Sequence, residues 1–251
     1  MNEPQTKVKS LYKAIQVLNC FTTAEPELGI TELADRLGIY KSSVHNIVST
    51  YEQCGMLTKN PRTGKYHLGL RILELSHVLL HNHDLRQVAR PFMAELAART
   101  GETCHLACCL DRQVLYVDTV LPDEAALARS ITGLKAPMYC TGLGKAILAF
   151  MPEAFIREVM EMGYERFTND TIMTDADLLA DLEAVRARGY SVDQMEHEYG
   201  VKCIGVPLLS RERVPLAAIS ITGPSLRFAD ETIPALAAEV MQTARQIERM
   251  L

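Results

Sequence analysis

The 251-residue chain has no Trp, and only 6% of its residues are aromatic. It has no apolar run near the ~18 residues that a membrane span needs. Its first ten residues, MNEPQTKVKS, lack the apolar stretch of a secretory signal. Seven Cys is an odd number without framework spacing, which predicts reduced thiols in a cytoplasmic protein. With 48% hydrophobic residues, the composition excludes a disordered chain and allows one large domain or two small ones.

The formal net charge of -5 is unevenly distributed. Residues 1–75 contain nine Lys and Arg against seven Asp and Glu, whereas the remainder contains 17 against 24. A mildly basic segment 1–75 followed by an acidic segment 76–251 predicts two functions, and the basic segment is the one expected to contact phosphate.

Apolar residues recur at i, i+3, i+4 and i+7 three times near the amino terminus, which predicts three short helices. The sets are Leu11, Ala14, Ile15 and Leu18; Ile30, Leu33, Ala34 and Leu37; and Val44, Ile47, Val48 and Tyr51. Gly38 lies where the second helix must turn into the third, and Ser42 and Ser43 are expected to cap the third. This order predicts a helix-turn-helix.

A basic hairpin follows these helices. Turn residues 60–64 separate two short β-like segments, so we expect a wing, and residues 56–71 contain four cations and no acid. The third helix presents short hydrogen-bonding side chains opposite its apolar face, which predicts a helix that enters a DNA groove. A merely solvated polar helix is the alternative. The predicted DNA-binding residues are Lys41, Ser42, Ser43, His45, Asn46, Thr50, Lys59, Arg62 and Lys65.

The rest of the chain predicts an α+β fold with a mainly antiparallel sheet, because strands come first, helices follow and strands return. Expected strands are 103–110, 113–121, 127–132, 190–193, 202–209 and 214–222. Expected helices are 84–99, 142–150, 152–162, 175–188 and 231–250. We predict a winged helix-turn-helix over 1–69, a linker helix over 70–83, and an effector-binding and oligomerisation domain over 84–251.

Residues 9–71 resemble the winged helix-turn-helix of the IclR family of bacterial transcription regulators. The matching segments are 10–18, 30–34, 37–39, 41–45 and 66–72. Gly189, Asp193, Glu196, Leu208 and the run 203–205 resemble the family signature in its carboxy-terminal domain. Asn46 departs from the family's usual Arg, and Leu209 and Ser210 depart from the end of the signature. The resemblance implies a GAF/PAS-like domain that binds a small molecule, often an organic acid, with Asp193 and Cys203 lining the pocket.

Two features support an acid-binding site independently of this resemblance. Thr141-Gly142-Leu143-Gly144 precedes a predicted helix, whose free amides would attract an anion, although its spacing is not that of a Walker loop. Ser220 and Thr222 share one face of a strand. The alternative for segment 141–144 is a glycine turn without a ligand, and the alternative for Ser220 and Thr222 is that they are polar side chains at the edge of a strand without a binding role. The predicted effector-binding residues are Gly142, Leu143, Asp193, Cys203, Ser220 and Thr222.

Residues expected in the same pocket also suggest a metal site. Some sugar-acid regulators of the family resemble this chain in offering a Cys, a His and an Asp, so His105, Asp193 and Cys203 could bind zinc. A buried His and a buried thiol in a pocket wall are the simpler interpretation. His77 and His81, four residues apart, could bind a metal but fit better as polar residues of an interface.

We predict a non-enzymatic, DNA-binding repressor controlled by a small carboxylate, for example a sugar acid. Its partners would be double-stranded DNA and further copies of itself, as a homodimer or tetramer. The alternative is a GAF-like cysteine enzyme or a thiol-based redox sensor acting through Cys203. The sequence lacks a G-x-S-x-G elbow, a dinucleotide fingerprint and a C-x-x-C pair, which disfavours an enzyme.

Overall fold

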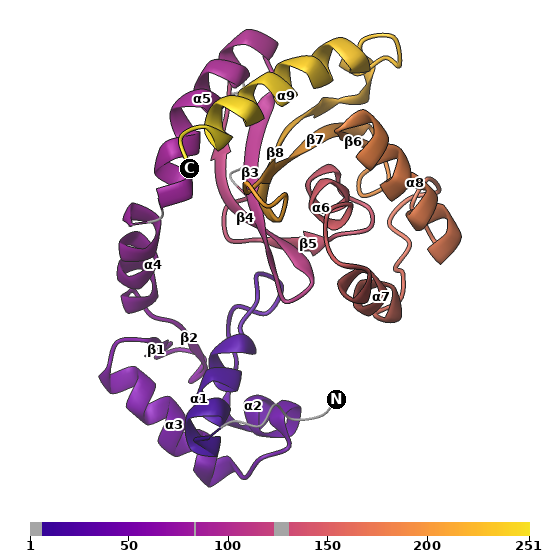
Figure 1. The fold of residues 1–251 in the computed structure, drawn as a ribbon. Helices are drawn as coiled ribbons and strands as arrows, with labels where there is room; N and C mark the ends of the chain where they lie inside the picture. Colours follow the sequence, from indigo (N-terminus) through magenta and orange to yellow (C-terminus); the bar gives the residue numbers. More distant parts are fainter. Residues whose placement is uncertain (1–6, 83, 123–130) are drawn as a thin grey trace. The chain divides into compact units, whose positions relative to one another are not determined.

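The computed structural model describes residues 7–82, 84–122 and 131–251 (Figure 1). The chain divides into two compact units, Met1–Asn82 and His83–Leu251. In the described residues, every helix is too short or too polar to cross a membrane.

The first unit is a helix-turn-helix with a two-stranded wing, which confirms the predicted fold. Its elements are α1 (Lys9–Asn19), α2 (Ile30–Leu37), α3 (Lys41–Gln53), β1 (Leu57–Lys59), β2 (Tyr66–Leu68) and α4 (Arg71–His81). The apolar faces of α1, α2 and α3 meet in one core around Val17, Leu33, Val44 and Val48. Gly38 ends α2 with φ of 63°, a left-handed conformation that glycine adopts without strain.

The start of α3 corrects one expectation. Its first residue is Lys41 and its N-cap is Tyr40, and within the described residues the helix has no side-chain cap. Ser42 and Ser43 therefore lie in the first helical turn, where their hydroxyls face outward as exposed groups. The wing pairs Leu57 with Leu68, and a bridge from Leu28 to Tyr66 joins it to the segment before α2.

The second unit is built on one antiparallel sheet of six strands. Its strand order is β5-β4-β3-β8-β7-β6, and every neighbouring pair is antiparallel, as predicted. The strands are β3 (Thr103–Leu110), β4 (Gln113–Val120), β5 (Lys135–Pro137), β6 (Ser191–Gln194), β7 (Val201–Leu209) and β8 (Pro215–Pro224). The helices are α5 (Asp84–Thr100), α6 (Gly142–Leu148), α7 (Glu153–Glu161), α8 (Asp175–Arg188), the 3-10 turn Ser225–Arg227 and α9 (Ile233–Glu248).

Helices cover both faces of this sheet (Figure 1). α5 and α9 pack on one face around Met93, Leu96 and Val240, whereas α6, α7 and α8 form a second core on the other. The expected strand at 127–132 falls mostly outside the described residues, and Ile131 and Thr132 are not in a strand. The edge strand is instead β5, whose three residues are too few to show an alternating pattern.

Candidate functional site

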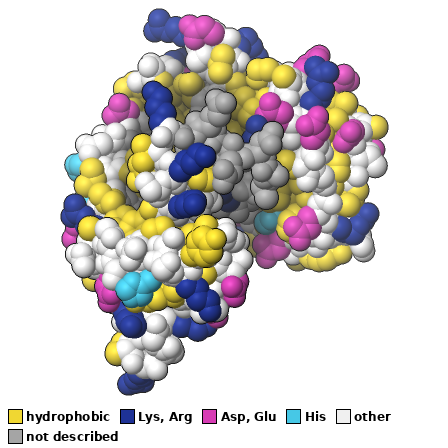
Figure 2. Space-filling view, turned by 90° about the horizontal axis from the view of Figure 1, so that it is seen from below, with side chains coloured by type: hydrophobic (Ala, Val, Ile, Leu, Met, Phe, Trp, Pro, Cys, Tyr) yellow, Lys and Arg dark blue, Asp and Glu magenta, His cyan; other side chains and the backbone are white. Residues whose placement is uncertain are grey.

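The polar face of α3 is exposed as a unit. Val44 and Val48 are buried in the core, while the predicted DNA-binding residues of this helix are all exposed. The Thr50 hydroxyl donates to the backbone carbonyl of Asn46 at 2.9 Å, and Asn46 itself is exposed. On the face drawn in Figure 2, Lys and Arg side chains are scattered among neutral and apolar ones. The exposed hydroxyl, amide and imidazole groups of α3 are suited to specific contacts more than to attraction by charge alone.

The wing carries its three predicted cations in different ways. Arg62 is exposed at the tip of the turn, where its backbone N–H donates to Oδ1 of Asn60 at 2.9 Å. Lys59 is exposed, with its ammonium 5.6 Å from the centre of the Tyr66 ring. Lys65 instead pairs with Glu32 of α2 at 2.6 Å. Arg62 and Lys59 are thus available to phosphate, whereas Lys65 ties the wing to α2.

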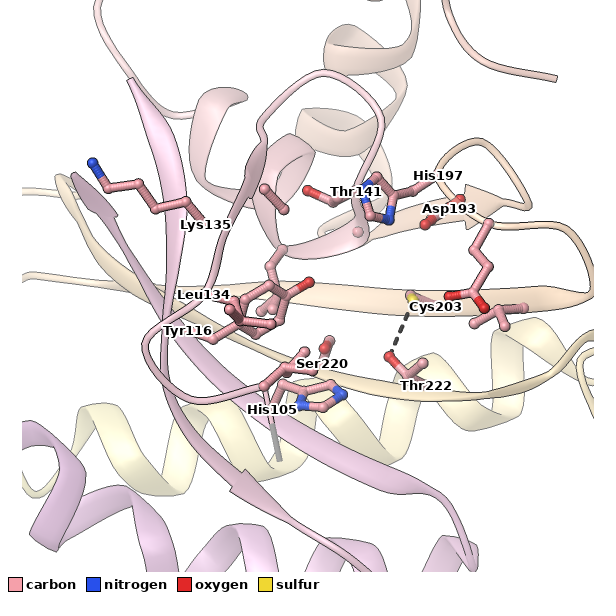
Figure 3. A pocket seen from close by; sticks show the side chains of 16 residues that line it. His105, Tyr116, Leu134, Lys135, Thr141, Asp193, His197, Cys203, Ser220 and Thr222 are labelled. Atoms are coloured by element: carbon pink, nitrogen blue, oxygen red, sulfur yellow. Dashed lines mark hydrogen bonds between the residues drawn. The ribbon is translucent and has the colours of Figure 1, made fainter. Parts of the chain in front are cut away.

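The second unit contains a cavity of about 190 Å³ whose walls come from α6 and from all the strands of the sheet. All six predicted effector-binding residues line it (Figure 3). The full lining is His105, Tyr116, Ile131, Leu134, Lys135, Ala136, Thr141, Gly142, Leu143, Asp193, His197, Glu198, Val201, Cys203, Ser220 and Thr222.

Two glycines bring α6 against the sheet at this cavity. A Cβ atom on Gly142 would lie 3.1 Å from the Cβ of Cys203 on β7. A Cβ atom on Gly205 would lie 2.4 Å from the Gly142 carbonyl oxygen, a distance that real Cβ atoms do not tolerate. Ser191 of β6 closes the junction, because its hydroxyl donates to the Gly142 carbonyl. The two glycine motifs in the sequence are therefore packing partners.

The amino-terminal end of α6 offers fewer amides than expected. The Thr141 hydroxyl accepts from the Gly144 N–H at 3.2 Å, so that donor is already capped. Helix geometry leaves the amides of Gly142 and Leu143 without an intrahelical acceptor. A ligand can therefore reach at most these two backbone amides, so the side chains of the cavity must provide most of its hydrogen bonds.

Ser220 provides the clearest unmet hydrogen-bonding group of the cavity. It is 1% exposed, and among the described residues its Oγ has no hydrogen-bond partner. A buried hydroxyl without a partner is costly, and a bound polar ligand would remove that cost. Its neighbour on the same face, Thr222, donates to Cys203 Sγ at 3.0 Å.

Asp193 lies in the opposite wall from Ser220 (Figure 3). It is 3% exposed, and its Oδ1 accepts from the Glu196 N–H at 2.7 Å. Burial, with the negative charge of Glu196 as a second cause, raises the pKa of Asp193 to about 7. The carboxyl can therefore hold a proton near neutral pH and donate it in a hydrogen bond.

A buried ion cluster lies behind this wall. Lys145, one turn into α6, is 1% exposed, and its Nζ donates to the Val192 carbonyl at 2.8 Å. The same Nζ pairs with Glu196 and, at 2.9 Å, with Asp181 of α8. Burial opposes the charge of Lys145, but the two carboxylates prevail and raise its pKa. The cluster fixes α6 to the segment that carries Asp193.

The predicted zinc trio is not assembled. His105, Asp193 and Cys203 line the same cavity, but nowhere in the described residues do three His, Cys, Asp or Glu side chains gather closely enough to hold a metal ion. His105 instead bonds to the Thr119 hydroxyl at 3.1 Å, and burial lowers its pKa to about 4. The structure thus matches the simpler interpretation of a neutral, buried His. On α4, the rings of His77 and His81 stack with centroids 5.9 Å apart.

The cavity also disfavours thiol chemistry. Burial is the main cause that raises the pKa of Cys203, so its thiol stays protonated and is a poor nucleophile. The seven cysteines are all free thiols.

Several cavity residues were not anticipated from the sequence, among them Tyr116, Leu134 and His197. Tyr116 of β4 and Leu134 form one wall, and His197 forms part of another (Figure 3). Tyr116 sits beside an irregularity in strand pairing, and His197 sits in a loop, so neither followed a periodic pattern. The aromatic side chain of Tyr116 inside a half-buried strand was the only signal in the sequence.

Comparison with known proteins gives one consistent result. The IclR helix-turn-helix domain matches residues 10–61, and the bacterial transcriptional regulator IclR C-terminal domain matches residues 77–249. The HTH-type transcriptional regulator XynR of Escherichia coli is 31% identical over 245 residues, covering 97% of both chains.

Solved structures agree in fold. An IclR transcriptional regulator from Alicyclobacillus acidocaldarius superposes with a TM-score of 0.85 at 23% identity, over 97% of this chain and 99% of that one. An IclR homologue from Microbacterium hydrocarbonoxydans complexed with 4-hydroxybenzoate gives 0.78 at 26% identity, over 96% and 98%. The chain belongs to the IclR family of bacterial transcriptional regulators.

Proposed function

We propose that the protein is a repressor that binds operator DNA through α3 and the wing. Its affinity for the operator changes when a small carboxylate occupies the cavity. Membership of a family of DNA-binding regulators supports the first part. The exposed polar face of α3, with His45 and Asn46 at its centre, supplies groups that pair with base edges. As a DNA-binding bacterial regulator, the protein would act in the cytoplasm.

The effector is proposed from the hydrogen-bonding groups of the cavity. The single observation that carries it is Ser220, whose buried hydroxyl has no partner in the described part of the chain. A ligand oxygen there could accept from Ser220 and from the amide of Leu143, while a protonated Asp193 donates to the same carboxylate. The complex of one relative with 4-hydroxybenzoate, itself a carboxylate, supports this class.

A hydroxyl-rich acid fits this cavity better than a purely apolar one. Glu198 can accept from ligand hydroxyls, and Lys135 is already paired with Asp111 at 2.8 Å. We therefore propose a sugar acid as the effector, with no metal or other cofactor assigned.

Paired recognition helices need at least two copies of the chain. Because two-fold proteins read half-sites of a pseudo-palindrome, we propose a homodimer, or a dimer of dimers, as the DNA-binding form.

The effector proposal is tested by thermal shift with D-gluconate, pyruvate and 4-hydroxybenzoate. A ligand raises the melting temperature in proportion to its binding. At least one acid should stabilise the wild type, and Ser220→Ala should weaken that stabilisation. Ser225→Ala, outside the cavity, is the matched control and should behave as the wild type. Equal stabilisation of both variants would place the ligand elsewhere.

A further inference from the structure

Strand β4 contains a β-bulge between the cavity and α5. Leu106 of β3 pairs with Asp118, whereas the next residue, Ala107, pairs with Tyr116. Val117 is therefore left without a partner on β3, which is the definition of a bulge. Because the bulge breaks the alternation of the strand, Tyr116 and Thr119 face the same side although they are three residues apart.

Both of these side chains contact one histidine of the cavity wall. The Tyr116 and His105 rings meet edge to face with centroids 5.4 Å apart. The Thr119 hydroxyl lies 3.1 Å from His105 Nδ1. His105 and Tyr116 line the cavity themselves (Figure 3). A ligand that moves either ring would therefore act on the backbone on both sides of Val117.

Asp118, which lies directly before Thr119, faces the other side of the sheet. Asp118 has a side chain only 5% exposed, and its oxygens accept from Arg90 of α5 at 2.7 and 2.8 Å. Arg86, one turn earlier on α5, lies 3.3 Å from the same carboxylate. The Thr119 N–H also donates to Asp118, at 3.0 Å. A buried carboxylate thus joins the bulge to two turns of α5.

α5 is the first helix of the second unit and follows directly after α4 in the sequence. α5 begins at Asp84, and α4, the last helix of the DNA-binding unit, ends at His81. In the sequence, only residues 82 and 83 separate α4 from α5. The bulge also interrupts the hydrogen-bonded ladder between β3 and β4 at this point, because its extra residue makes no ladder pair.

We propose that the β4 bulge transmits the occupancy of the cavity to α5, through His105 and Tyr116 on one side and the Asp118 ion pairs with Arg86 and Arg90 on the other. This inference rests on the proposed function only in taking the cavity to be the effector site. Asp118 is then a positioning residue: it touches no ligand, but it determines whether α5 responds to one.

The test uses a fixed occupant, so that it does not depend on the identity of the effector. Ser220→Leu places an isobutyl group in the cavity of the full chain, and hydrogen exchange is followed in the peptides of Asp84–Thr100. We expect exchange in α5 to change about threefold or more. When Asp118→Asn is combined with Ser220→Leu, the change relative to Asp118→Asn alone should fall below about 1.5-fold.

Glu102→Gln provides the matched control. The Glu102 side chain is 4% exposed and pairs with Arg227, so it is a second buried carboxylate, directly before β3, with an arginine partner outside α5. The response of α5 to Ser220→Leu should persist in this background. If Asp118→Asn is too unstable to measure, Arg90→Gln removes one of the two arginine partners of Asp118 and should also lower the response of α5.

Two outcomes would overturn the inference. One is an α5 response of equal size with and without Asp118→Asn. The other is a response to Ser220→Leu that stays in the neighbouring strands β3 and β8 and does not reach α5. Failure of the proposed function gives a different result, since the thermal shift with D-gluconate, pyruvate and 4-hydroxybenzoate would then show no stabilisation while the α5 response to the filled cavity remained.

Discussion

Gly142 of α6 and Gly205 of β7 lie in backbone contact, with the carbonyl of the first in the space where a side chain of the second would be. The two residues are far apart in the sequence: Gly142 is the first residue of α6, and Gly205 belongs to the run 203–205 that resembles the family signature. Their contact sets the distance between α6 and the sheet, and thereby the depth of the cavity.

The contact predicts a large effect of a single methyl group. Gly205→Ala should lower the free energy of unfolding by about 2–3 kcal/mol, because overpacking against backbone cannot be relieved by a side-chain rotation. Denaturant unfolding of the full chain measures it. Gly200→Ala, where a Cβ meets no atom within 4 Å and only the left-handed φ of 77° is strained, should cost about 1 kcal/mol. Equal losses would show that backbone strain, not the close contact, determines the result.

Lys145 predicts a different kind of destabilisation. Lys145→Met removes a buried cation and leaves the buried Glu196 without its ion-pair partner, while Asp181 keeps only Arg188 at 3.6 Å, so we expect a loss of about 3–5 kcal/mol in unfolding experiments. Arg157→Met is the control, since Arg157 and Glu153 form an exposed pair worth less than about 1 kcal/mol. A loss as small for Lys145 as for Arg157 would contradict a structural role for the cluster.

The DNA interface predicts two separable phenotypes. Asn46→Ala should change which base pair is preferred at one position, with a cost of about 1–3 kcal/mol on the duplex selected by the wild type. Arg62→Ala should instead weaken binding to all duplexes and reduce the salt slope by about one. Fluorescence anisotropy on selected and random duplexes at several salt concentrations distinguishes them. If Asn46→Ala weakened both duplexes equally, base recognition by this residue would be excluded.

Lys65 should differ from the other two cations of the wing. Because it pairs with Glu32, Lys65→Ala removes an anchor of the wing as well as a charge. We expect Glu32→Gln, which leaves the positive charge in place, to reproduce part of its loss of DNA affinity. No effect of Glu32→Gln in the same anisotropy assay would show that Lys65 acts on DNA alone.

Effector binding should depend on pH through Asp193. Burial raises its pKa to about 7, so below that pH the carboxyl is protonated and can donate to a ligand carboxylate. As pH rises through 7 the proton is lost, two negative charges face each other, and affinity should fall by up to tenfold per pH unit. Calorimetry with whichever acid stabilises the protein, between pH 6 and 8, measures this. Asp193→Asn should bind with a flat profile; a profile that stays as steep would assign the titration to another group.

The sequence predicted the elements with clear periodicity and missed those without it. The helix-turn-helix, the antiparallel sheet and six of the residues that line the cavity followed from apolar spacing, turn chemistry and family motifs. The three-residue strand β5 and the bulge at Val117 did not, because neither leaves a repeating pattern. Residue types alone likewise placed His105 and Asp193 near one cavity but could not reveal that they occupy opposite walls (Figure 3).

The inward orientation of Lys145 has a consequence for ligand class. A glycine-rich turn followed by lysine invites comparison with loops that cradle nucleotide phosphates, where the ammonium group must reach out to the phosphoryl oxygens. Here the ammonium is enclosed by two carboxylates and a carbonyl, so the turn retains no cation for ATP or GTP. Nucleotides should therefore leave the melting temperature of this regulator unchanged even at millimolar concentration.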